Sequence, residues 1–318
     1  PEALSGKVVL VTGGAKRVGA AIVRRLHREG ASVMLHYRGS EREANALRSE
    51  LNAARANSVA LVQADLLDLA GLAEIVRNAV NRFDRIDALV NNASAFFPTP
   101  VGEITQATWE SLVGANLRAP LFLSQAAAPH LKKTNGAIVN ITDIHADRPL
   151  KNYVIYSIAK AGLAGLTRSL ARELGPEVRV NGVAPGPIAW PEDGSFDEVT
   201  RQRVISNTIL RRTGEPDDVA RAVYYLIAEA PYVTGQIIAV DGGRSTWSGT
   251  LLPHRDAPAG REGARCGRLW LRGCPGNRGA VRRSSLVGGP SPRDPVRSGE
   301  RHLWRPTHVD RALPRRLR

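Results

Sequence analysis

Residues 7–19, KVVLVTGGAKRVG, decide the fold of this chain. Residues 7–12 form a continuous apolar run, which predicts a strand covered on both faces of a sheet. Gly13 and Gly14 then predict a turn, and the amphipathic pattern after them predicts a helix that ends near Gly30. Backbone N–H groups at such a junction point at an anion, and the helix dipole favours its charge. The stretch therefore predicts a dinucleotide phosphate site; a plain β–α turn is the alternative.

Six further apolar runs predict strands, and helical patterns or loops separate them. They lie at residues 32–37, 58–62, 87–90, 137–141, 178–183 and 236–243. Strands that alternate with helices predict an α/β fold of the Rossmann type, with a doubly wound parallel sheet of seven strands. We expect one domain over residues 1–249. Residues 188–214 read as irregular, and an irregular segment of that length predicts a substrate loop.

The positive charge of the chain is concentrated at its C-terminal end. Residues 251–318 carry +11 of the formal net charge of +14, which leaves +3 for residues 1–250. Both cysteines also lie there. Residues 250–318 are rich in Arg, Gly and Pro without a helical or strand period, which predicts a disordered tail. Nucleic acid is an expected partner only through this tail. No signal peptide or membrane span is recognised, so we expect a cytoplasmic protein.

The residues after the second strand favour a cofactor with a 2′-phosphate. An acid at this place usually binds a free ribose 2′-hydroxyl, but Arg38, Gly39 and Ser40 stand here. Together with Lys16 and Arg17 they can surround a phosphate with charge-assisted hydrogen bonds. The sequence therefore predicts NADP(H); a solvated loop charge is the alternative for Arg38.

Other polar and aromatic residues follow the predicted strands. Asp65 is expected either to contact the adenine or to cap the helix predicted at 68–81. Asn91 and Asn92 are expected to bond neighbouring strands and hold the cofactor loop. Phe96 either stacks on a flat substrate or covers the edge of the core. One long helix or two are expected between Thr105 and Leu131.

Residues 143–160, DIHADRPLKNYVIYSIAK, carry the candidate chemistry. On a helix, Tyr156 and Lys160 share one face, a turn apart. A nearby cation favours phenolate over phenol, so we expect a lowered tyrosine pKa and a general acid in Tyr156. Asp143 follows the apolar run at 137–141, at a strand end where open α/β sheets bind ligands.

Together these motifs resemble the short-chain dehydrogenase/reductase family. The motifs that carry the resemblance are Thr12-Gly13-x-x-x-Arg17-x-Gly19, Asn91-Asn92-Ala93, Asn116, Tyr156-Ser157-x-Ala159-Lys160, Pro185-Gly186 and Asp241-Gly242-Gly243. Two positions depart from the general family pattern: Arg17 replaces a glycine and Asp143 replaces the catalytic serine. Both departures, with His36-Tyr37-Arg38 and the segment 92–96, are similar to the pteridine reductase branch.

The resemblance implies a role for each matching residue, and no metal. It implies catalytic roles for Asn116, Asp143, Tyr156 and Lys160, and cofactor contacts from Thr12, Gly13, Lys16, Arg17, Val18, Gly19, His36, Tyr37, Arg38, Ser40, Asp65, Leu66, Asn92, Ala93, Ser94, Tyr156, Lys160, Pro185 and Gly186. It implies substrate contacts from Arg17, Ser94, Phe96, Asp143, Tyr156 and Trp190. The segment Pro187–Trp190 lacks the threonine that many relatives place after Pro-Gly.

The reaction expected from this resemblance is NADPH-dependent reduction of a pterin C=N bond, with biopterin, a dihydropterin or dihydromonapterin as substrate, in a homotetramer. Tyr156 is expected to donate the proton with help from Asp143. Carbonyl or 3-oxoacyl reduction is the enzymatic alternative, which a carboxylate at position 143 disfavours because, unless it is protonated, it repels a developing oxyanion. A nucleic-acid-binding protein built around the tail is the non-enzymatic alternative.

Overall fold

The computed structural model describes residues 3–188 and 197–246, all within one compact unit. Its centre is a seven-stranded sheet in the order β3-β2-β1-β4-β5-β6-β7, with every neighbouring pair parallel. The strands are β1 (Val8–Val11), β2 (Ser32–Tyr37), β3 (Val59–Gln63), β4 (Ala88–Asn91), β5 (Ala137–Ile141), β6 (Arg179–Pro185) and β7 (Ile237–Val240). The predicted doubly wound sheet is confirmed, and its order reverses between β1 and β4, where such sheets bind ligands. The predicted tail at 250–318 and its boundary lie outside the described residues.

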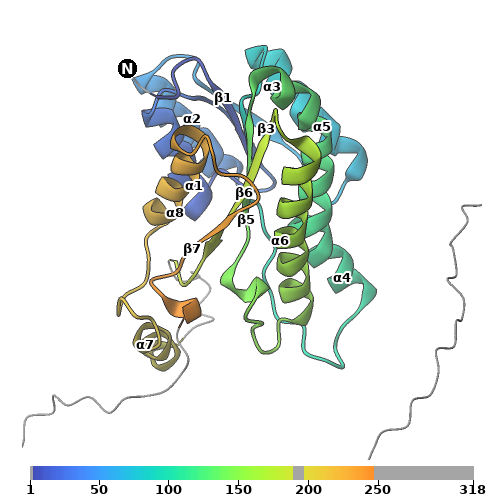
Figure 1. Cartoon of the computed structure of the whole chain (residues 1–318), viewed down its shortest axis with the longest axis vertical. Coiled ribbons are helices and arrows are strands. Elements are labelled where there is room, and N and C mark those ends of the chain that lie inside the picture. The colour runs from blue at the N-terminus through green and yellow to red at the C-terminus, as the bar shows by residue number, and fades with distance from the viewer. Residues whose placement is uncertain (1–2, 189–196, 247–318) are drawn as a thin grey trace, which may run out of the picture. The chain divides into compact units, whose positions relative to one another are not determined.

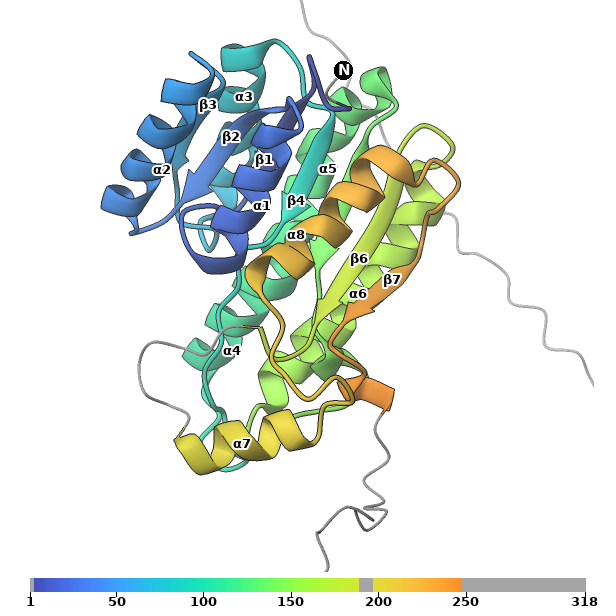
Figure 2. The same cartoon turned by 90° about the vertical axis from the view of Figure 1, so that its left-hand side faces the viewer.

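Helices cover both faces of the sheet (Figures 1 and 2). One layer contains α1 (Arg17–Arg28), α2 (Glu41–Ala54) and α8 (Pro216–Tyr224), and the other contains α3 (Leu69–Phe83), α5 (Ala119–Thr134) and α6 (Val154–Leu174). Strand β1 shows why both layers form. Val9 and Val11 pack into the core under α1 and α8, whereas Leu10 packs into the core under α3 and α5. Alternate side chains of a strand point to opposite faces, so an unbroken apolar strand needs a cover on each.

The segment predicted as one helix or two is a single helical path with a π turn in it. It runs through α4 (Gln106–Val113), the π turn η1 (Gly114–Arg118) and α5. Thr105 caps its start, because Thr105 Oγ1 accepts a hydrogen bond of 3.2 Å from Thr108 N. A π turn is rare and often marks a functional site; this one contains Asn116.

The prediction that residues 188–214 are irregular is wrong for residues 198–206. Helix α7 (Glu198–Ser206) occupies it, with Asp197 Oδ1 accepting a hydrogen bond of 2.8 Å from Thr200 N. The helix buries none of its residues, so it has no apolar period by which the sequence could reveal it. Residues 189–196, with Trp190, lie outside the described residues.

No helix among the described residues is long and apolar enough to cross a membrane. The cytoplasmic location stays a prediction.

The turn between β1 and α1 has no room for side chains at two glycines. Gly13 has a φ of +62°, and a Cβ there would lie 2.9 Å from Ala93 Cα. A Cβ at Gly19 would lie 2.7 Å from Asn92 Nδ2 and closer still to the Gly13 carbonyl oxygen. Glycine therefore lets the turn approach the end of β4 and leaves the α1 N-terminus open.

We predict opposite effects for two glycine-to-alanine changes. Gly19→Ala should lower the free energy of unfolding by about 2 kcal/mol or more, because the backbone around the turn must move. Gly165→Ala is the control, since it lies inside α6 with nothing within 4 Å of a new Cβ. It should raise the stability by about 0.5–1 kcal/mol through helix propensity. Urea unfolding curves measure both; a destabilised Gly165→Ala or an unaffected Gly19→Ala would contradict the packing described.

Candidate active site

A cavity of about 720 Å³ opens at the carboxyl ends of the strands, where the switch point of the sheet predicts a site. Segments that follow all seven strands contribute to its wall. Most of the predicted site residues line it. Thr12 and Asn116 do not line it and support residues that do, and Trp190 is not described. Among the described residues, no group of three or more His, Cys, Asp or Glu could hold a metal ion.

His36 hydrogen-bonds to the backbone of the glycine turn. Its Nδ1 accepts a hydrogen bond of 3.2 Å from Gly13 N, so its Nε2 carries the proton and donates to Ala64 O at 3.1 Å. Burial lowers the pKa of His36, which keeps the ring neutral. Both ring nitrogens of His36 bond to backbone, so His36 positions Gly13, and the cofactor contact expected of it stays a prediction.

The asparagines after β4 clamp the strand end to the glycine turn, as the sequence analysis predicts. Asn92 Nδ2 donates to Thr12 O at 2.9 Å and to Gly13 O at 3.0 Å. Thr12 Oγ1 accepts hydrogen bonds from the backbone N–H groups of Asn92 and Ala93. Asn91 Nδ2 bonds to Asn140 Oδ1 on β5 at 2.8 Å. The wall of the cavity is thus fixed on two strands.

The structure brings the predicted cationic residues to one end of the cavity. The cationic residues Lys16, Arg17 and Arg38 line it, together with Ser40, which offers a hydroxyl group. Arg17 has a φ of +49°, a left-handed conformation that costs a non-glycine residue about 1 kcal/mol, and it stands where the general family pattern has glycine. Asp65 also lines the cavity. The alternative that Asp65 caps the following helix is wrong, because Asp68 caps α3 through Ala70 N.

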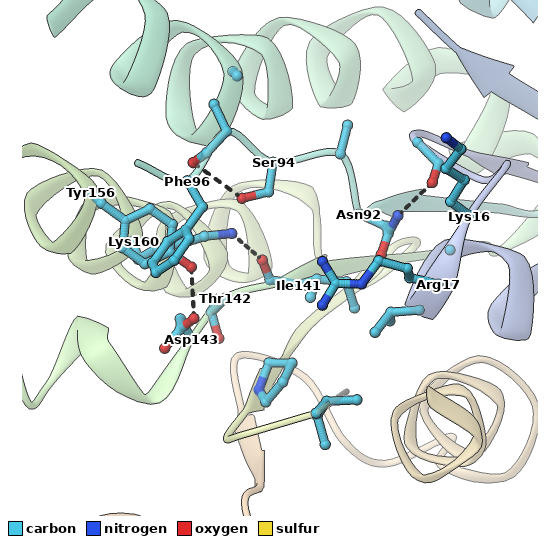
Figure 3. A pocket seen from close by; sticks show the side chains of 18 of the residues that line it. Lys16, Arg17, Asn92, Ser94, Phe96, Ile141, Thr142, Asp143, Tyr156 and Lys160 are labelled. Atoms are coloured by element: carbon cyan, nitrogen blue, oxygen red, sulfur yellow. Dashed lines mark hydrogen bonds between the residues drawn. The ribbon is translucent and has the colours of Figure 1, made fainter. Parts of the chain in front are cut away.

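At the other end of the cavity, Tyr156 and Asp143 are directly hydrogen-bonded to each other (Figure 3). Tyr156 Oη donates a hydrogen bond of 2.6 Å to Asp143 Oδ2. The second carboxylate oxygen, Asp143 Oδ1, accepts a hydrogen bond of 2.8 Å from His145 N, which fixes the side chain. Strand β5 delivers Asp143 and the first turn of α6 delivers Tyr156, so the two meet although they lie 13 residues apart.

The expectation that Lys160 lowers the pKa of Tyr156 is wrong in this structure. Burial and the carboxylate of Asp143 raise the pKa of Tyr156 well above its usual value, so the phenol keeps its proton. Lys160 is on the same helix face, but its Nζ lies 5.7 Å from the Tyr156 ring centre and donates to Ile141 O at 2.8 Å. Burial lowers the pKa of Lys160 to about 8.

Asn116 holds the serine that follows β4. Ser94 Oγ donates to Asn116 Oδ1 at 2.7 Å, and Asn116 Nδ2 donates to Ala95 O and Leu112 O, each at 2.9 Å. Asn116 is fully buried. It is therefore a satisfied structural polar group that sets the direction of the Ser94 hydroxyl.

Phe96 forms an aromatic wall beside the phenol. Its ring stacks on Tyr153 with 4.5 Å between ring centres, and its centre lies 4.8 Å from that of Tyr156 in an edge-on arrangement. Phe96 remains 42% exposed and lines the cavity. Sequence reasoning missed Tyr153; its place in the turn before α6 was the available signal. It also missed His145, Val204 and Arg244, which line the cavity without a motif.

Comparisons with known proteins agree with this geometry. A family model described as Enoyl-(Acyl carrier protein) reductase matches residues 13–245. Pteridine reductase 1 of Leishmania tarentolae is 38% identical over 280 residues, which cover 75% of this chain and 96% of that protein. The Streptomyces violaceoruber protein named "Granaticin polyketide synthase putative ketoacyl reductase 2" is 36% identical over 248 residues, which cover 76% of this chain and 97% of that protein.

Solved structures agree as well. The crystal structure of a blue fluorescent protein from a metagenomic library, in complex with NADPH, is 36% identical and has a TM-score of 0.72. The match covers 76% of this chain and 98% of that one. The glycine turn, the Tyr156–Lys160 helix face and these matches lead to one conclusion: the chain belongs to the short-chain dehydrogenase/reductase family of oxidoreductases.

Proposed function

We propose that the chain is an NADPH-dependent pteridine reductase that adds a hydride and a proton across a C=N bond of a pterin. The observation that carries this proposal is the 2.6 Å hydrogen bond between Tyr156 and Asp143. Where the family pattern has a serine hydroxyl, this chain has a carboxyl group, which can accept and donate a proton. Such a pair suits a substrate whose ring nitrogen must be protonated.

The cofactor is NADPH, and the residues present fit it. The glycine turn leaves a cradle that a Cβ would fill, and the α1 N-terminus follows it with no side chain of Lys16 capping it. Both features favour a pyrophosphate. Arg38 and Ser40 with Lys16 offer charge-assisted hydrogen bonds to a 2′-phosphate. A structural neighbour that was solved with NADPH supports the same choice. Bound NADPH supplies the hydride.

Tyr156 and Asp143 together deliver the proton. When Asp143 is protonated, its O–H donates to Tyr156 Oη, and the phenol O–H is directed at the substrate nitrogen. As the substrate carbon gains the hydride, its nitrogen takes the proton of Tyr156, and Tyr156 takes the proton of Asp143. The pair then has the arrangement found in the structure, with the phenol donating to a carboxylate. Solvent returns one proton to Asp143 before the next turnover.

The aromatic wall supports a flat, conjugated substrate. Phe96 is backed by Tyr153 on one side and lines the cavity with the rest of its ring. A pterin that stacks on this ring lies beside Tyr156, whose centre is 4.8 Å from that of Phe96. Ser94 and Arg17 line the same cavity and offer a hydroxyl and a cation to the polar edge of the pterin.

The same enzyme family also reduces carbonyl groups, and the 36% identity to a ketoacyl reductase favours this second candidate. Asp143 argues against it. In carbonyl reduction, negative charge develops on the substrate oxygen, and the Asp143 carboxylate repels that charge whenever it is unprotonated, whereas the serine of the family pattern carries no charge. Nucleic-acid binding through residues 250–318 is independent of this site.

We also propose that the chain assembles as a homotetramer. Leu121 and Phe122 on α5 are each 38% exposed, and Ile158 on α6 is 49% exposed. Apolar side chains exposed on neighbouring helices favour burial against another subunit. Size-exclusion chromatography with light scattering measures the assembly directly.

A substrate panel tests the proposed activity. NADPH oxidation should be followed with biopterin, dihydrobiopterin, dihydromonapterin, dihydrofolate and an acetoacetyl thioester. We expect kcat/KM for the best pterin to exceed that for the thioester by about 10²-fold or more. Equal or better use of the thioester would assign the chain to the carbonyl and 3-oxoacyl reductases.

Asp143→Asn should lower kcat for a dihydropterin by about 10²-fold or more, the scale for loss of a positioned acid–base group. The cofactor Kd should stay within about twofold, because Asp143 lies at the other end of the cavity from Lys16 (Figure 3). Asp143→Ser restores the family's hydroxyl and should lose pterin reduction while it gains weak carbonyl reduction. Turnover near that of the parent in Asp143→Asn would show that Asp143 is only a turn residue.

Arg38→Ala should reduce the preference for NADPH over NADH about tenfold, because it removes a charge-assisted hydrogen bond to the 2′-phosphate. Arg48→Ala removes the same charge from the exposed face of α2, outside the cavity, and should leave the preference unchanged. The measurement is kcat/KM for both cofactors. Parent values that are equal for NADPH and NADH would refute the cofactor assignment.

Lys160→Met should abolish turnover and yet stabilise the fold at pH 7 by about 2 kcal/mol. The pKa of Lys160 is lowered from 10.5 to about 8, so below pH 8 the folded protein buries an ammonium that the unfolded chain leaves in water. The stability of the parent relative to the variant should therefore rise between about pH 8 and 10.5. Unfolding curves across this range test it, with exposed Lys151→Met as the control. A stability difference that does not change with pH would contradict it.

A further inference from the structure

An ion pair lies at the cationic end of the cavity. Lys16 Nζ is 2.9 Å from Glu43 Oε1. Lys16 immediately precedes α1 and lines the cavity, whereas Glu43 lies in the first turn of α2 and does not line it. The connection from β2 to α2 contains Arg38 and Ser40, which line the cavity. Glu43 therefore holds Lys16 beside the residues that we assign to the 2′-phosphate.

The ion pair between Lys16 and Glu43 is weak enough for another anion to displace Glu43 from Lys16. The Lys16 and Glu43 side chains are 53% and 33% exposed, and water screens a pair of that kind strongly. The hydrogen bond from Lys16 lowers the pKa of Glu43, so the carboxylate is ionised at neutral pH. A phosphate carries more charge than a carboxylate and accepts more hydrogen bonds. A phosphate that enters the cavity can therefore take Lys16 from Glu43.

We propose that Glu43 is a built-in counter-ion for Lys16 that competes with the 2′-phosphate of the cofactor and so sets how strongly the enzyme prefers NADPH. This inference rests on the cofactor assignment above. When the 2′-phosphate binds Lys16, Glu43 keeps Arg42, whose Nη2 lies 3.9 Å from Glu43 Oε1, as a partner. Glu43 weakens the binding of NADPH and of NADP⁺ alike, so it limits cofactor affinity and favours release of the oxidised cofactor.

Two features separate this effect from general electrostatics. The competition acts only on ligands with a 2′-phosphate, since the pyrophosphate binds at the glycine turn. It also requires Lys16: without the lysine, Glu43 contributes only the weak repulsion of a half-exposed charge. The effect of Glu43 should therefore depend on the residue at position 16 and should shrink at high salt.

The test measures binding without turnover, by isothermal titration calorimetry with adenosine 2′,5′-bisphosphate and adenosine 5′-monophosphate. Glu43→Gln should bind the bisphosphate about fivefold more tightly than the parent and the monophosphate equally well, which is the upper scale for one exposed ion pair that the phosphate must displace. In a Lys16→Gln background, Glu43→Gln should change the bisphosphate Kd by less than twofold.

Glu50→Gln is the matched control. Glu50 pairs with Arg24 at 2.7 Å and also links α1 to α2, but neither residue lines the cavity. This variant loses the same charge and an equivalent interhelical pair, so its bisphosphate Kd should equal that of the parent. Thermal melts confirm that each variant is folded.

The outcomes separate this inference from the proposed function. If the parent prefers the bisphosphate but Glu43→Gln binds it equally or more weakly, the counter-ion role is refuted and the NADPH assignment stands. The counter-ion role would also be refuted if Glu43→Gln tightened bisphosphate binding by the same factor in the Lys16→Gln background. If the parent binds the two nucleotides equally, both the assignment and the inference fail. None of these results depends on whether a pterin is reduced.

Discussion

The hydrogen bond between Tyr156 Oη and Asp143 Oδ2 is the interaction on which the proposed chemistry depends. It places a proton donor against a group that can refill it, inside a site where the phenol is 4% exposed. Burial and the neighbouring carboxylate both raise the pKa of Tyr156, so the tyrosine alone is a poor acid. Because the carboxyl group can itself be protonated, the pair can deliver a proton that the phenol alone would retain.

The fold supports this bond through features far from it in the sequence. All residues of strand β5 are buried, which fixes the strand in the sheet, and Asp143 follows its last residue by two positions. Helix α6 packs beside β6 and brings Tyr156 and Lys160 to the same edge. On the other side, the glycine turn, His36 and Asn92 hold a second edge of the cavity. The two edges define where a dinucleotide would lie relative to Tyr156.

The seven strands could be predicted from sequence because they follow from local patterns, whereas most of the site residues were implied by the family resemblance. Apolar runs mark buried strands, and glycines mark the close approach of Gly13 to Ala93. Two features could not be predicted. Helix α7 buries none of its residues, so it leaves no periodic signal. The pKa of Tyr156 depends on which charge lies nearer its oxygen. Both Lys160 and Asp143 are visible in the sequence, but only the three-dimensional structure shows that the phenol hydrogen-bonds to Asp143.

The central claim is that the pair must hold two protons when it reacts. The most direct measurement is the pH dependence of the hydride-transfer rate for a dihydropterin in single-turnover experiments with the parent protein. The account predicts a rate that falls about tenfold per pH unit within a range in which Tyr156 is still protonated, because the raised pKa of Tyr156 keeps its proton in place there. A rate that stays constant until the tyrosine itself ionises would contradict the account, because Tyr156 would then act without Asp143.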